Sequence, residues 1–366
     1  MIKIVHIYSA KTQQHVPSMI TNTLIYFAKN KEQEHLFYLH EFNKFKEGYQ
    51  ALLHTYPTLR IHNLSTPKEL NLLIDQLGKN DKLILHNFFI PVFWINFLLL
   101  SNISLKKIVW VCWGSGAHWV KGVKGFFINN FRSYIFKKIN AIITLMSPDH
   151  NQIIKNFQLK NAILLPYYSR IWDFQNNPMF ENILPYSNTG TTIRIKVGNS
   201  ASGTNLHFDA FKLLQRFKDE NIKIITPLSY GADVTRMKII EVGKSIFEDK
   251  FEPFLTHLSQ MDYAKFLSME TDILVYNAKT QTGLFNLYFA IYCGKKVYVN
   301  GYNYEWLKAM NVKVFNVDEL NKISFSEFII PLSDQDITLN RQNLIKSISV
   351  EYISPRWNDL FNRKNS

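Results

Sequence analysis

Two series of short runs rich in β-branched residues, each followed by a polar or helical segment, constrain the fold of this chain most strongly. The first series lies at 2–8, 83–86, 107–112, 141–145 and 162–165, and the second at 193–197, 222–226, 273–276 and 296–300. Alternation of this kind predicts parallel sheets with crossover helices. We therefore expect an α/β protein of two Rossmann-like domains that face a central cleft.

Turn-forming residues separate the two series. Residues 176–192 read NNPMFENILPYSNTGTT, and Asn, Pro, Ser, Thr and Gly favour turns over regular structure. We place the domain boundary in this segment, with a first domain over 1–180 and a second over 190–348. The remaining residues, 349–366, are expected to form a helix that returns to the first domain.

Composition excludes several classes of protein. With 46% hydrophobic and 19% charged residues, the chain has enough apolar material for packed cores, which excludes intrinsic disorder. Cys112 and Cys293 are too few for a disulfide framework or a cysteine zinc site, and both lie in apolar runs, as buried thiols do. The first residues read as a strand, and the longest uncharged apolar stretch, 88–100, is shorter than the roughly 20 residues of a membrane span. We expect a cytoplasmic protein.

The positive charge of the chain, +13 in total, is concentrated in one region. Positions 82–148 contain eight Lys or Arg residues and many aromatic residues but no Asp or Glu. This composition favours a surface that meets anionic lipid headgroups, although nucleic acid would also suit it and an ordinary solvated face is a third interpretation. The residues expected to face the membrane are Lys121, Lys124, Phe126, Phe127, Arg132, Lys137 and Lys138.

Small polar residues follow the first strand of the second series, in the sequence KVGNSASGTNLH. Gly198 and Gly203 allow close backbone approach, and Ser200 and Thr204 supply hydroxyl donors beside the start of a helix. Because the free N–H groups of a helix start favour an anion, the loop suits a diphosphate. It is neither a Walker A nor a GxGxxG sequence. The alternative is a plain turn in which Thr204 or Asn205 caps the helix.

Two later strands end in loops of the same kind. In TPLSYG, Tyr230 could stack on a base or contact a phosphate, or it could simply belong to a tight turn. In YNAKTQTGLFN, Gly283 permits close approach and Lys279 offers a counter-charge to phosphate. Gln281 and Asn286 can bind sugar hydroxyls, although Asn286 could instead bond the backbone of its own helix.

In order and spacing these loops resemble the C-terminal donor domain of bacterial 4-acetamido-4,6-dideoxygalactose (Fuc4NAc) transferases of enterobacterial common antigen synthesis, which form glycosyltransferase family 56. In the second half, the similar elements are VGNS at 197–200, Asn205-x-His207, the loop 227–231, Gln281-x-Gly283 and Gly294. In the first half the similarity is thinner and rests on His6, His15, His86, Pro91, Trp94, Trp110 and the Trp113-Gly114 pair, and it returns at Ser354-Pro355. The resemblance therefore spans nearly the whole chain.

This resemblance implies a GT-B fold and a glycosyltransferase that moves a deoxy-amino sugar from a nucleotide-diphosphate donor, dTDP-linked rather than UDP-linked. The acceptor would be a saccharide carried on undecaprenyl diphosphate, used in cell-surface polysaccharide synthesis. The donor would bind the second domain and the acceptor the first, with the enzyme peripheral on the cytoplasmic face of an anionic membrane. The residues expected to bind the donor are Gly198, Asn199, Ser200, Thr204, Asn205, His207, Ser229, Tyr230, Gly231, Lys279, Gln281, Gly283 and Asn286.

The catalytic base is not given by the resemblance. The family pattern follows its Trp-Gly pair with a small residue and Asp, whereas this chain has Ser115-Gly116 there, so no catalytic role carries over to that position. If a base deprotonates the acceptor hydroxyl, histidine is suited because its pKa is near neutrality. The candidates are His86, at a strand end, followed by His15 and His118. A purely structural His86 is the alternative.

No metal or other cofactor is expected. Asp334-Gln335-Asp336 precedes a helical segment at 337–348, where N-capping explains the sequence better than metal binding does. Helix-terminal amides and basic side chains can neutralise a leaving nucleoside diphosphate. Two other functions stay open, a nucleotide-sugar 2-epimerase on the same frame and a basic nucleic-acid-binding protein. Because the chain contains no recognisable nucleic-acid reader motif, we expect no nucleic-acid partner.

Overall fold

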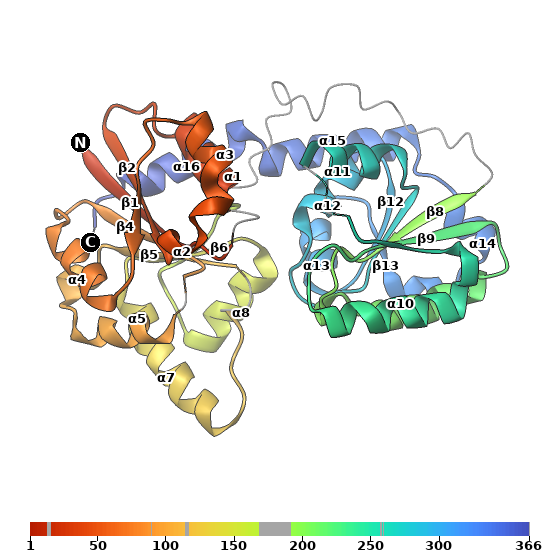
Figure 1. Ribbon diagram of the computed structural model, residues 1–366, viewed down its shortest axis with the longest axis horizontal. Coiled ribbons are helices and arrows are strands. Elements are labelled where there is room, and N and C mark those ends of the chain that lie inside the picture. Colours follow the sequence, from red (N-terminus) through yellow and green to blue (C-terminus); the bar gives the residue numbers. More distant parts are fainter. Residues whose placement is uncertain are drawn as a thin grey trace. The chain divides into compact units, whose positions relative to one another are not determined.

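The structure is a computed structural model in which residues 1–12, 16–88, 90–113, 117–167, 192–256, 258 and 260–365 are described. The chain forms two compact units, Met1–Ile171 with Val350–Ser366, and Trp172–Ser349 (Figure 1). The expected domain boundary at 176–192 lies outside the described residues except for Thr192. The C-terminal helix α16, Val350–Asn362, belongs to the first unit.

A parallel sheet of seven strands, in the order β3-β2-β1-β4-β5-β6-β7, forms the centre of the first unit. Its strands are β1 (Ile2–Ser9), β2 (Gln33–His40), β3 (Ile61–Leu64), β4 (Lys82–His86), β5 (Ile108–Cys112), β6 (Ala141–Thr144) and β7 (Ala162–Leu164). Strands β4, β5 and β6 are buried along their whole length, as is usual for a parallel sheet covered on both faces.

Helices connect these strands. They are α1 (Val16–Tyr26), α2 (Phe42–Phe45), α3 (Gln50–Thr55), α4 (Pro67–Gln76), α5 (Pro91–Asn96), α6 (Asn102–Leu105), α7 (Gly122–Lys138) and α8 (Ser147–Phe157), with a short 3-10 helix η2 (Phe97–Leu99) after α5. Helix α4 begins where it does because Thr66 and Glu69 form a capping box around Pro67 at the first helical position. None of the helices in the described ranges is both long and apolar enough to span a bilayer.

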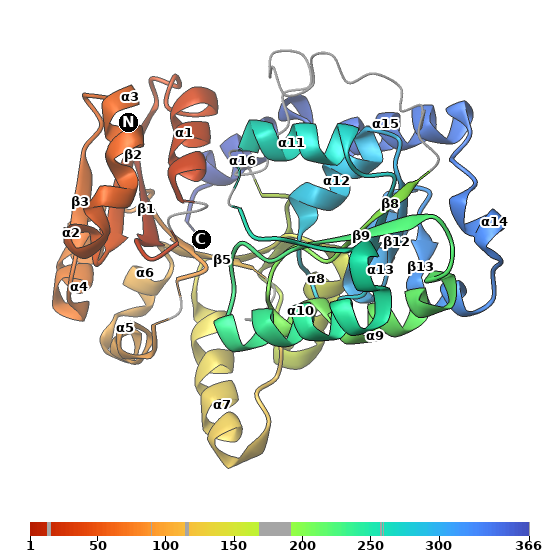
Figure 2. The ribbon, with the colours of Figure 1, turned by 45° about the vertical axis from the view of Figure 1, so that its right-hand side comes forward.

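A second parallel sheet, in the order β10-β9-β8-β11-β12-β13, forms the centre of the other unit. Its strands are β8 (Ile193–Val197), β9 (Ile222–Pro227), β10 (Phe251–Phe254), β11 (Ile273–Tyr276), β12 (Lys296–Val299) and β13 (Phe315–Asn316). Its helices are α9 (His207–Leu214), α10 (Asp233–Phe247), α11 (Gln260–Met269), α12 (Leu284–Tyr292), α13 (Gly301–Ala309), α14 (Phe325–Ile329) and α15 (Asp334–Ile348), with 3-10 helices η6 (Gly203–Asn205) and η9 (Val317–Asn321). Figure 2 shows α11 and α15 on one side of this sheet and α9 and α10 on the other.

The start of α15 corrects one detail of the sequence analysis. The N-cap is Ser333, whose side chain accepts from the backbone N–H of Asp336, and neither aspartate of the Asp-x-Asp sequence is the cap. Both aspartates lie in the first helical turn, where a carboxylate stabilises the positive end of the helix dipole. Asp336 also pairs with Lys313 at 2.6 Å.

Each sheet reverses its strand order at one position. In the first sheet, successive strands run outwards in one direction from β1 and in the other from β4, and the second sheet does the same from β8 and β11. The loops at the carboxyl ends of such a pair diverge, and ligands of α/β proteins bind in the crevice between them. The loops after β1, β4, β8 and β11 are therefore where functional residues are expected.

Candidate functional site

Glycines stand at the two loops that flank the reversal point of the second sheet. Gly198, directly after β8, has φ 66°, and Gly283, directly before α12, has φ 60°. A Cβ at Gly198 would lie 2.4 Å from Nε2 of His207, and a Cβ at Gly283 would lie 2.5 Å from the ring of Tyr276. Glycine is therefore required at both positions by backbone conformation and by packing.

Hydrogen bonds internal to the first loop use several of the residues expected to bind a donor. The Oδ1 atom of Asn205 accepts from the backbone N–H of Asn199 at 3.2 Å, and its Nδ2 donates to Oγ of Ser200 at 3.1 Å. All three residues are buried. Ser202 and Thr204 pair through their hydroxyls at 2.8 Å. These side chains thus fix the shape of the loop. Oγ of Ser200 is the acceptor of its bond from Asn205, so the expectation that its hydroxyl donates to a ligand stays a prediction.

Helix α9 starts differently from the capped turn that the sequence suggests. Its N-cap position is Leu206, in the left-handed conformation with φ 48° and without a side-chain cap. Neither Thr204 nor Asn205 caps the helix, because both belong to the 3-10 turn η6. His207 is the first helical residue; it is buried, and no hydrogen-bond partner of its Nε2 is present among the described residues.

The loop after β9 is fastened to the loop after β8. The hydroxyl of Tyr230 accepts from Nδ2 of Asn199 at 3.0 Å, and its carbonyl accepts from the N–H of Ala201 at 2.8 Å. Ala201 and Gly231 form a parallel bridge, with Gly231 at φ 117°. The Tyr230 side chain remains 44% exposed. Ser229 is half-buried beside it.

A buried lysine lies beneath this loop. Nζ of Lys196, on β8, donates to the carbonyl of Gly198 at 2.7 Å and lies 3.5 Å from the hydroxyl of Tyr276. Burial lowers the pKa of Lys196 well below its usual range. Burial, with a contribution from Lys196, lowers the pKa of His207 to about 4. No ion pair recorded within the described ranges involves Lys196, so the loop has basic groups without a carboxylate partner.

The loop after β11 leads into the N-terminus of α12. Asn286 is buried, and its Nδ2 donates to the Tyr276 hydroxyl at 2.6 Å. The first turn of α12 contains no acidic residue. Oε1 of Gln281 is buried, and none of the described residues gives it a hydrogen-bond partner. The helix is followed by Gly294 with φ 78°.

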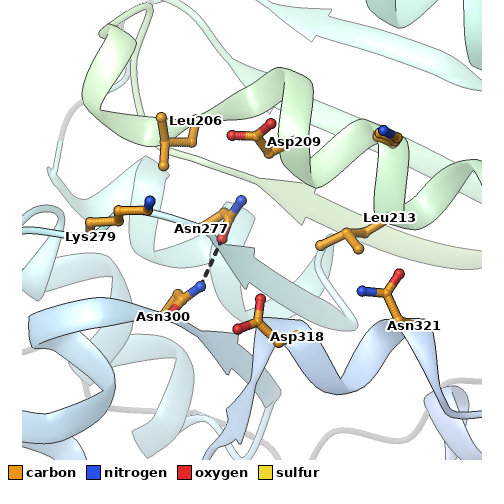
Figure 3. Close-up of a pocket in the computed structure, with 9 residues that line it drawn as sticks. Leu206, Asp209, Leu213, Asn277, Lys279, Asn300, Asp318 and Asn321 are labelled. Carbon is orange, nitrogen blue, oxygen red and sulfur yellow. Dashed lines mark hydrogen bonds between the residues drawn. The ribbon is translucent and has the colours of Figure 1, made fainter.

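A polar pocket of about 470 Å³ opens at the carboxyl end of the same sheet (Figure 3). Figure 3 shows Asp209 on α9 and Asp318 on η9 on opposite sides of it, with Asn277 and Asn300 between them. Nδ2 of Asn300 donates to Oδ1 of Asn277 at 3.2 Å. The residues lining the pocket are Leu206, Asp209, Lys212, Leu213, Asn277, Lys279, Asn300, Asp318 and Asn321. Of the expected donor-binding residues, only Lys279 is among them.

In the first unit, His86 lies at the carboxyl end of β4, beside the reversal point. Its Nδ1 is 2.5 Å from the Tyr167 hydroxyl and its Nε2 is 2.9 Å from Nδ1 of His6. Burial lowers its pKa well below the usual range. Both ring nitrogens of His86 therefore have hydrogen-bond partners, and its role as a base stays a prediction.

Of the two other histidines expected as bases, the described residues include only His118. His15 lies outside the described residues, as do the three residues 114–116 where the family pattern is broken. His118 is half-buried, and its carbonyl accepts from Arg132 at 3.3 Å. No group of three His, Cys, Asp or Glu side chains that could hold a metal ion occurs in the part of the chain that the structure describes.

Helix α7 carries most of the residues expected to face a membrane. Phe126 and Phe127 are 62% and 68% exposed, and Lys121 and Lys124 are exposed beside them. Lys137 is also exposed, whereas Lys138 is half-buried with Nζ over the Tyr134 ring. Arg132 is buried and bonds the carbonyl of His118, so its assignment to the membrane-facing surface is wrong.

Two parallel α/β units of this topology, each with its strand order reversed at one position, define the GT-B fold class. The chain belongs to glycosyl transferase group 56, the 4-alpha-L-fucosyltransferase family, whose sequence profile matches residues 1–364. The family assignment from the sequence is thereby confirmed. Among curated proteins, no sequence matches the chain significantly.

Solved structures with the same fold have very different sequences. A glycosyltransferase from Rickettsia africae is 12% identical, with a TM-score of 0.66, over 98% of this chain and 97% of its own. HepE from Anabaena in complex with UDP is 10% identical, with a TM-score of 0.66, over 98% and 99%. MnaA from S. aureus, in a co-structure with UDP, is 14% identical, with a TM-score of 0.55, over 98% and 95%. At these identities the likeness is one of fold.

Proposed function

We propose that the protein transfers a deoxy-amino sugar from a dTDP-linked donor to a saccharide on undecaprenyl diphosphate, at the cytoplasmic face of the membrane, for cell-surface polysaccharide synthesis. Family membership supports sugar transfer. The observation that carries the donor part is the set of basic groups without a carboxylate partner beneath the Gly198 loop. The acceptor part rests on the apolar and basic surface of the first unit.

A diphosphate fits the charges at the second unit's reversal point. Lys196 and His207 are buried bases there, and the N-terminus of α12 adds the positive end of a helix dipole. A bound diphosphate would supply the missing negative charge and favour the protonated forms of both side chains. The nearby pocket has the complementary chemistry, because the carboxylates of Asp209 and Asp318 accept hydrogen bonds from hydroxyl groups of a ribose or sugar.

The acceptor and membrane are assigned to the first unit because of two exposed apolar strips. One is on α7, with Val123, Phe126 and Phe127 exposed. The other runs along α5, η2 and α6, where Ile95, Leu99 and Ile103 are exposed. Figures 1 and 2 both show α5 and α7 at the same edge of this unit. Lysines flank the apolar side chains and carboxylates are absent from 82–148, a combination that suits anionic headgroups and a lipid diphosphate.

Calorimetric titration with dTDP, UDP and GDP and with their sugar conjugates tests the donor. We expect a dTDP-sugar to bind most tightly, with the same affinity in a chelator, because no metal is required. Lys196→Met should weaken binding of the diphosphates roughly tenfold or more while leaving the nucleoside alone unaffected. Lys238→Met, at an exposed site on α10, is the matched control. If neither dTDP nor UDP binds the wild-type protein, the donor proposal fails.

A nucleotide-sugar 2-epimerase is the second candidate, because a UDP-N-acetylglucosamine 2-epimerase shares the fold at a TM-score of 0.54 and 12% identity. An epimerase converts its donor without an acceptor. A transferase consumes the donor quickly only when an acceptor lipid is added. Product analysis with and without a lipid-linked saccharide therefore separates the two, and donor isomerisation in the absence of acceptor would contradict the transferase.

Vesicle flotation tests the membrane part. At low salt we expect the protein to float with vesicles of phosphatidylglycerol and phosphatidylcholine and not with phosphatidylcholine alone. Substituting Lys121, Lys124, Lys137 and Lys138 by Gln should release it, as should replacing Phe126 and Phe127 by Ser. Equal binding of the wild type to neutral and anionic vesicles would contradict the charge argument, and no binding to either would contradict the membrane assignment.

A further inference from the structure

A diagonal file of polar side chains crosses one buried face of the sheet in the first unit. It runs from Tyr167, beyond the end of β7, through His86 on β4 and His6 on β1 to His35 and Gln33 on β2. The strand register pairs His35 with Ile4 and His6 with Ile84. Each histidine is therefore displaced by two residues along its strand from the histidine on the neighbouring strand, and the file runs diagonally. The file therefore joins the carboxyl edge, where ligands are expected, to the opposite part of β2.

Each neighbouring pair in this file is within hydrogen-bond distance. The separations are 2.5 Å from Tyr167 Oη to His86 Nδ1, 2.9 Å from His86 Nε2 to His6 Nδ1, 2.9 Å from His6 Nε2 to His35 Nδ1, and 3.2 Å from His35 Nε2 to Gln33 Oε1. Beyond it, Gln33 Nε2 donates to Oδ1 of Asn362 on α16 at 2.9 Å. Five side chains from four strands or strand ends are thus connected without a gap.

The last link fixes the direction of all the others. Because Gln33 Oε1 only accepts, Nε2 of His35 must carry a hydrogen, and Nδ1 of the neutral ring must accept. The Nε2–H of His6 then donates to His35, and the Nε2–H of His86 donates to His6. Nδ1 of His86 is left as the acceptor of the Tyr167 hydroxyl. All three rings therefore have the same tautomer and point their hydrogens the same way.

The surroundings keep these rings neutral. Burial lowers the pKa of His6 and His86 well below the usual range and that of His35 to about 4. The titratable neighbours are Tyr8, whose ring stacks on His86 with centroids 4.2 Å apart, and Tyr167. The phenyl rings of Phe27, directly after α1, and of Phe361 on α16 pack against the file.

We propose that this file is a proton relay for glycosyl transfer, an inference that rests on the proposed function. The acceptor hydroxyl gives its proton to Tyr167 Oη as the Tyr167 proton moves to Nδ1 of His86. The Nε2 proton of His86 moves to Nδ1 of His6, and that of His6 moves to Nδ1 of His35. The acceptor oxygen forms a bond to the sugar C1 while the bond from C1 to the diphosphate breaks, and the nucleoside diphosphate leaves with the electron pair.

The relay places the resulting charge where the protein can hold it. A cation on His86 would be enclosed between the stacked rings of Tyr8 and His6, where burial makes a charge unfavourable. His35 is less buried than His6 and His86, and the Gln33 carbonyl accepts from its second N–H. His35 can therefore carry the positive charge briefly and pass the proton to water. Tyr167, His86, His6, His35 and Gln33 are relay residues, and none of them needs to bind the sugar.

Kinetics of two variants test the relay. Tyr167→Phe should lower kcat by about 10²–10⁴ with KM for the donor unchanged, because the proton can no longer enter the file. Gln33→Glu should raise the pKa of His35 by about 1–3 units. A protonated His35 cannot receive another proton, so the acid limb of the kcat profile should move to higher pH. Gln50→Glu, exposed on α3, makes the same change of charge and should leave the profile unmoved.

Nitrogen-15 NMR of the labelled wild-type protein tests the direction of the hydrogen bonds in the file, independently of enzyme activity. We expect neutral Nε2–H tautomers for His6, His35 and His86 at pH 7.5, and the opposite tautomer of His6 or His86 would overturn the relay. Identical pH profiles for Gln33→Glu and Gln50→Glu would overturn it as well. If the wild-type protein transfers no sugar from any nucleotide donor, the proposed function fails. The measured tautomers still show, independently of that result, whether the hydrogen bonds of the file run in the direction given above.

Discussion

Nε2 of His207 lies directly under the α-carbon of Gly198, at 2.4 Å from where a Cβ would be. With φ 66°, Gly198 also has a backbone conformation that other residues adopt only with strain. Gly198→Ala should therefore lower the free energy of unfolding by about 1–3 kcal/mol, measured by urea denaturation. The same variant should weaken donor binding, because the loop cannot keep its shape.

Gly203 provides a matched control in the same loop. A Cβ there would meet no atom within 4 Å, so Gly203→Ala should change stability by no more than about 0.5 kcal/mol. If the contact with His207 contributes to the Gly198→Ala defect, removing the imidazole in a Gly198→Ala/His207→Ala double variant should be non-additive. Strictly additive losses would mean that backbone strain alone is responsible.

Acid should destabilise the protein in a defined pH window. His35 and His207 have pKa values lowered to about 4 in the folded state, against about 6.5 when unfolded, and His6 and His86 are lowered as well. The unfolded chain therefore binds more protons, and the stability present above pH 6.5 is lost as the pH falls towards 4. Each group contributes up to about 1.4 kcal/mol per pH unit.

Urea denaturation at pH 7.5, 6 and 5 measures this effect. His207→Gln removes one titrating group. It should therefore reduce the slope of the free energy of unfolding against pH by up to about 1.4 kcal/mol per pH unit. Equal stability of the wild type at pH 7.5 and pH 5 would contradict the expectation, as would a slope that His207→Gln leaves unchanged.

Asp149 should have the opposite dependence on pH. Its carboxylate is buried in the first turn of α8, and neither oxygen has a hydrogen-bond partner among the described residues. Burial raises its pKa to about 6, so its contribution to stability is complete below about pH 3.8 and is lost as the pH rises through 6. Asp149→Asn should therefore stabilise the protein by about 1–2 kcal/mol at pH 7.5 and by less at pH 5. Asp75→Asn, exposed on α4, is the control, and an equal gain at both pH values would contradict the argument.

The sequence predicts the central strands of both sheets and the edge strand β7, and misses four strands at or near the other edges. All nine expected strands are present, with ends within one residue of the predicted ones. The four others are β2, β3, β10 and β13. β2 reads QEHLFYLH, where polar residues and histidines interrupt the apolar run, and β10 contains Pro253. Tertiary pairing, which a local pattern does not contain, makes these segments strands.

The candidate site was harder to predict because burial cannot be read from residue type. Asn199, Ser200, Asn205 and Asn286 have side chains suited to ligands, but in the fold they bond protein groups. Asn205 bonds Ser200 and the loop backbone, and the other two asparagines bond the hydroxyls of Tyr230 and Tyr276. Lys196 reads as a strand residue, and its position under Gly198 emerges only from the three-dimensional arrangement. The pocket residues Asp209 and Asp318 are more than 100 positions apart, and no short motif joins them.

In the basic stretch of the first unit, 82–148, some lysines are buried and stabilise the fold, whereas others are exposed and can contact a membrane. Nζ of Lys107 is buried and donates to the carbonyls of Ile74 at 3.1 Å and Leu77 at 2.6 Å, at the end of α4. Lys107→Met should thus lower the free energy of unfolding by about 1–3 kcal/mol and leave vesicle binding at low salt unchanged. Lys124→Gln, on the exposed side of α7, should weaken vesicle binding at low salt and leave the free energy of unfolding unchanged. Urea denaturation and vesicle flotation of both variants, at a temperature where both are folded, measure the two effects. Loss of vesicle binding by folded Lys107→Met would contradict the prediction. It would show that the net charge of the region, rather than its exposed lysines, attracts the membrane.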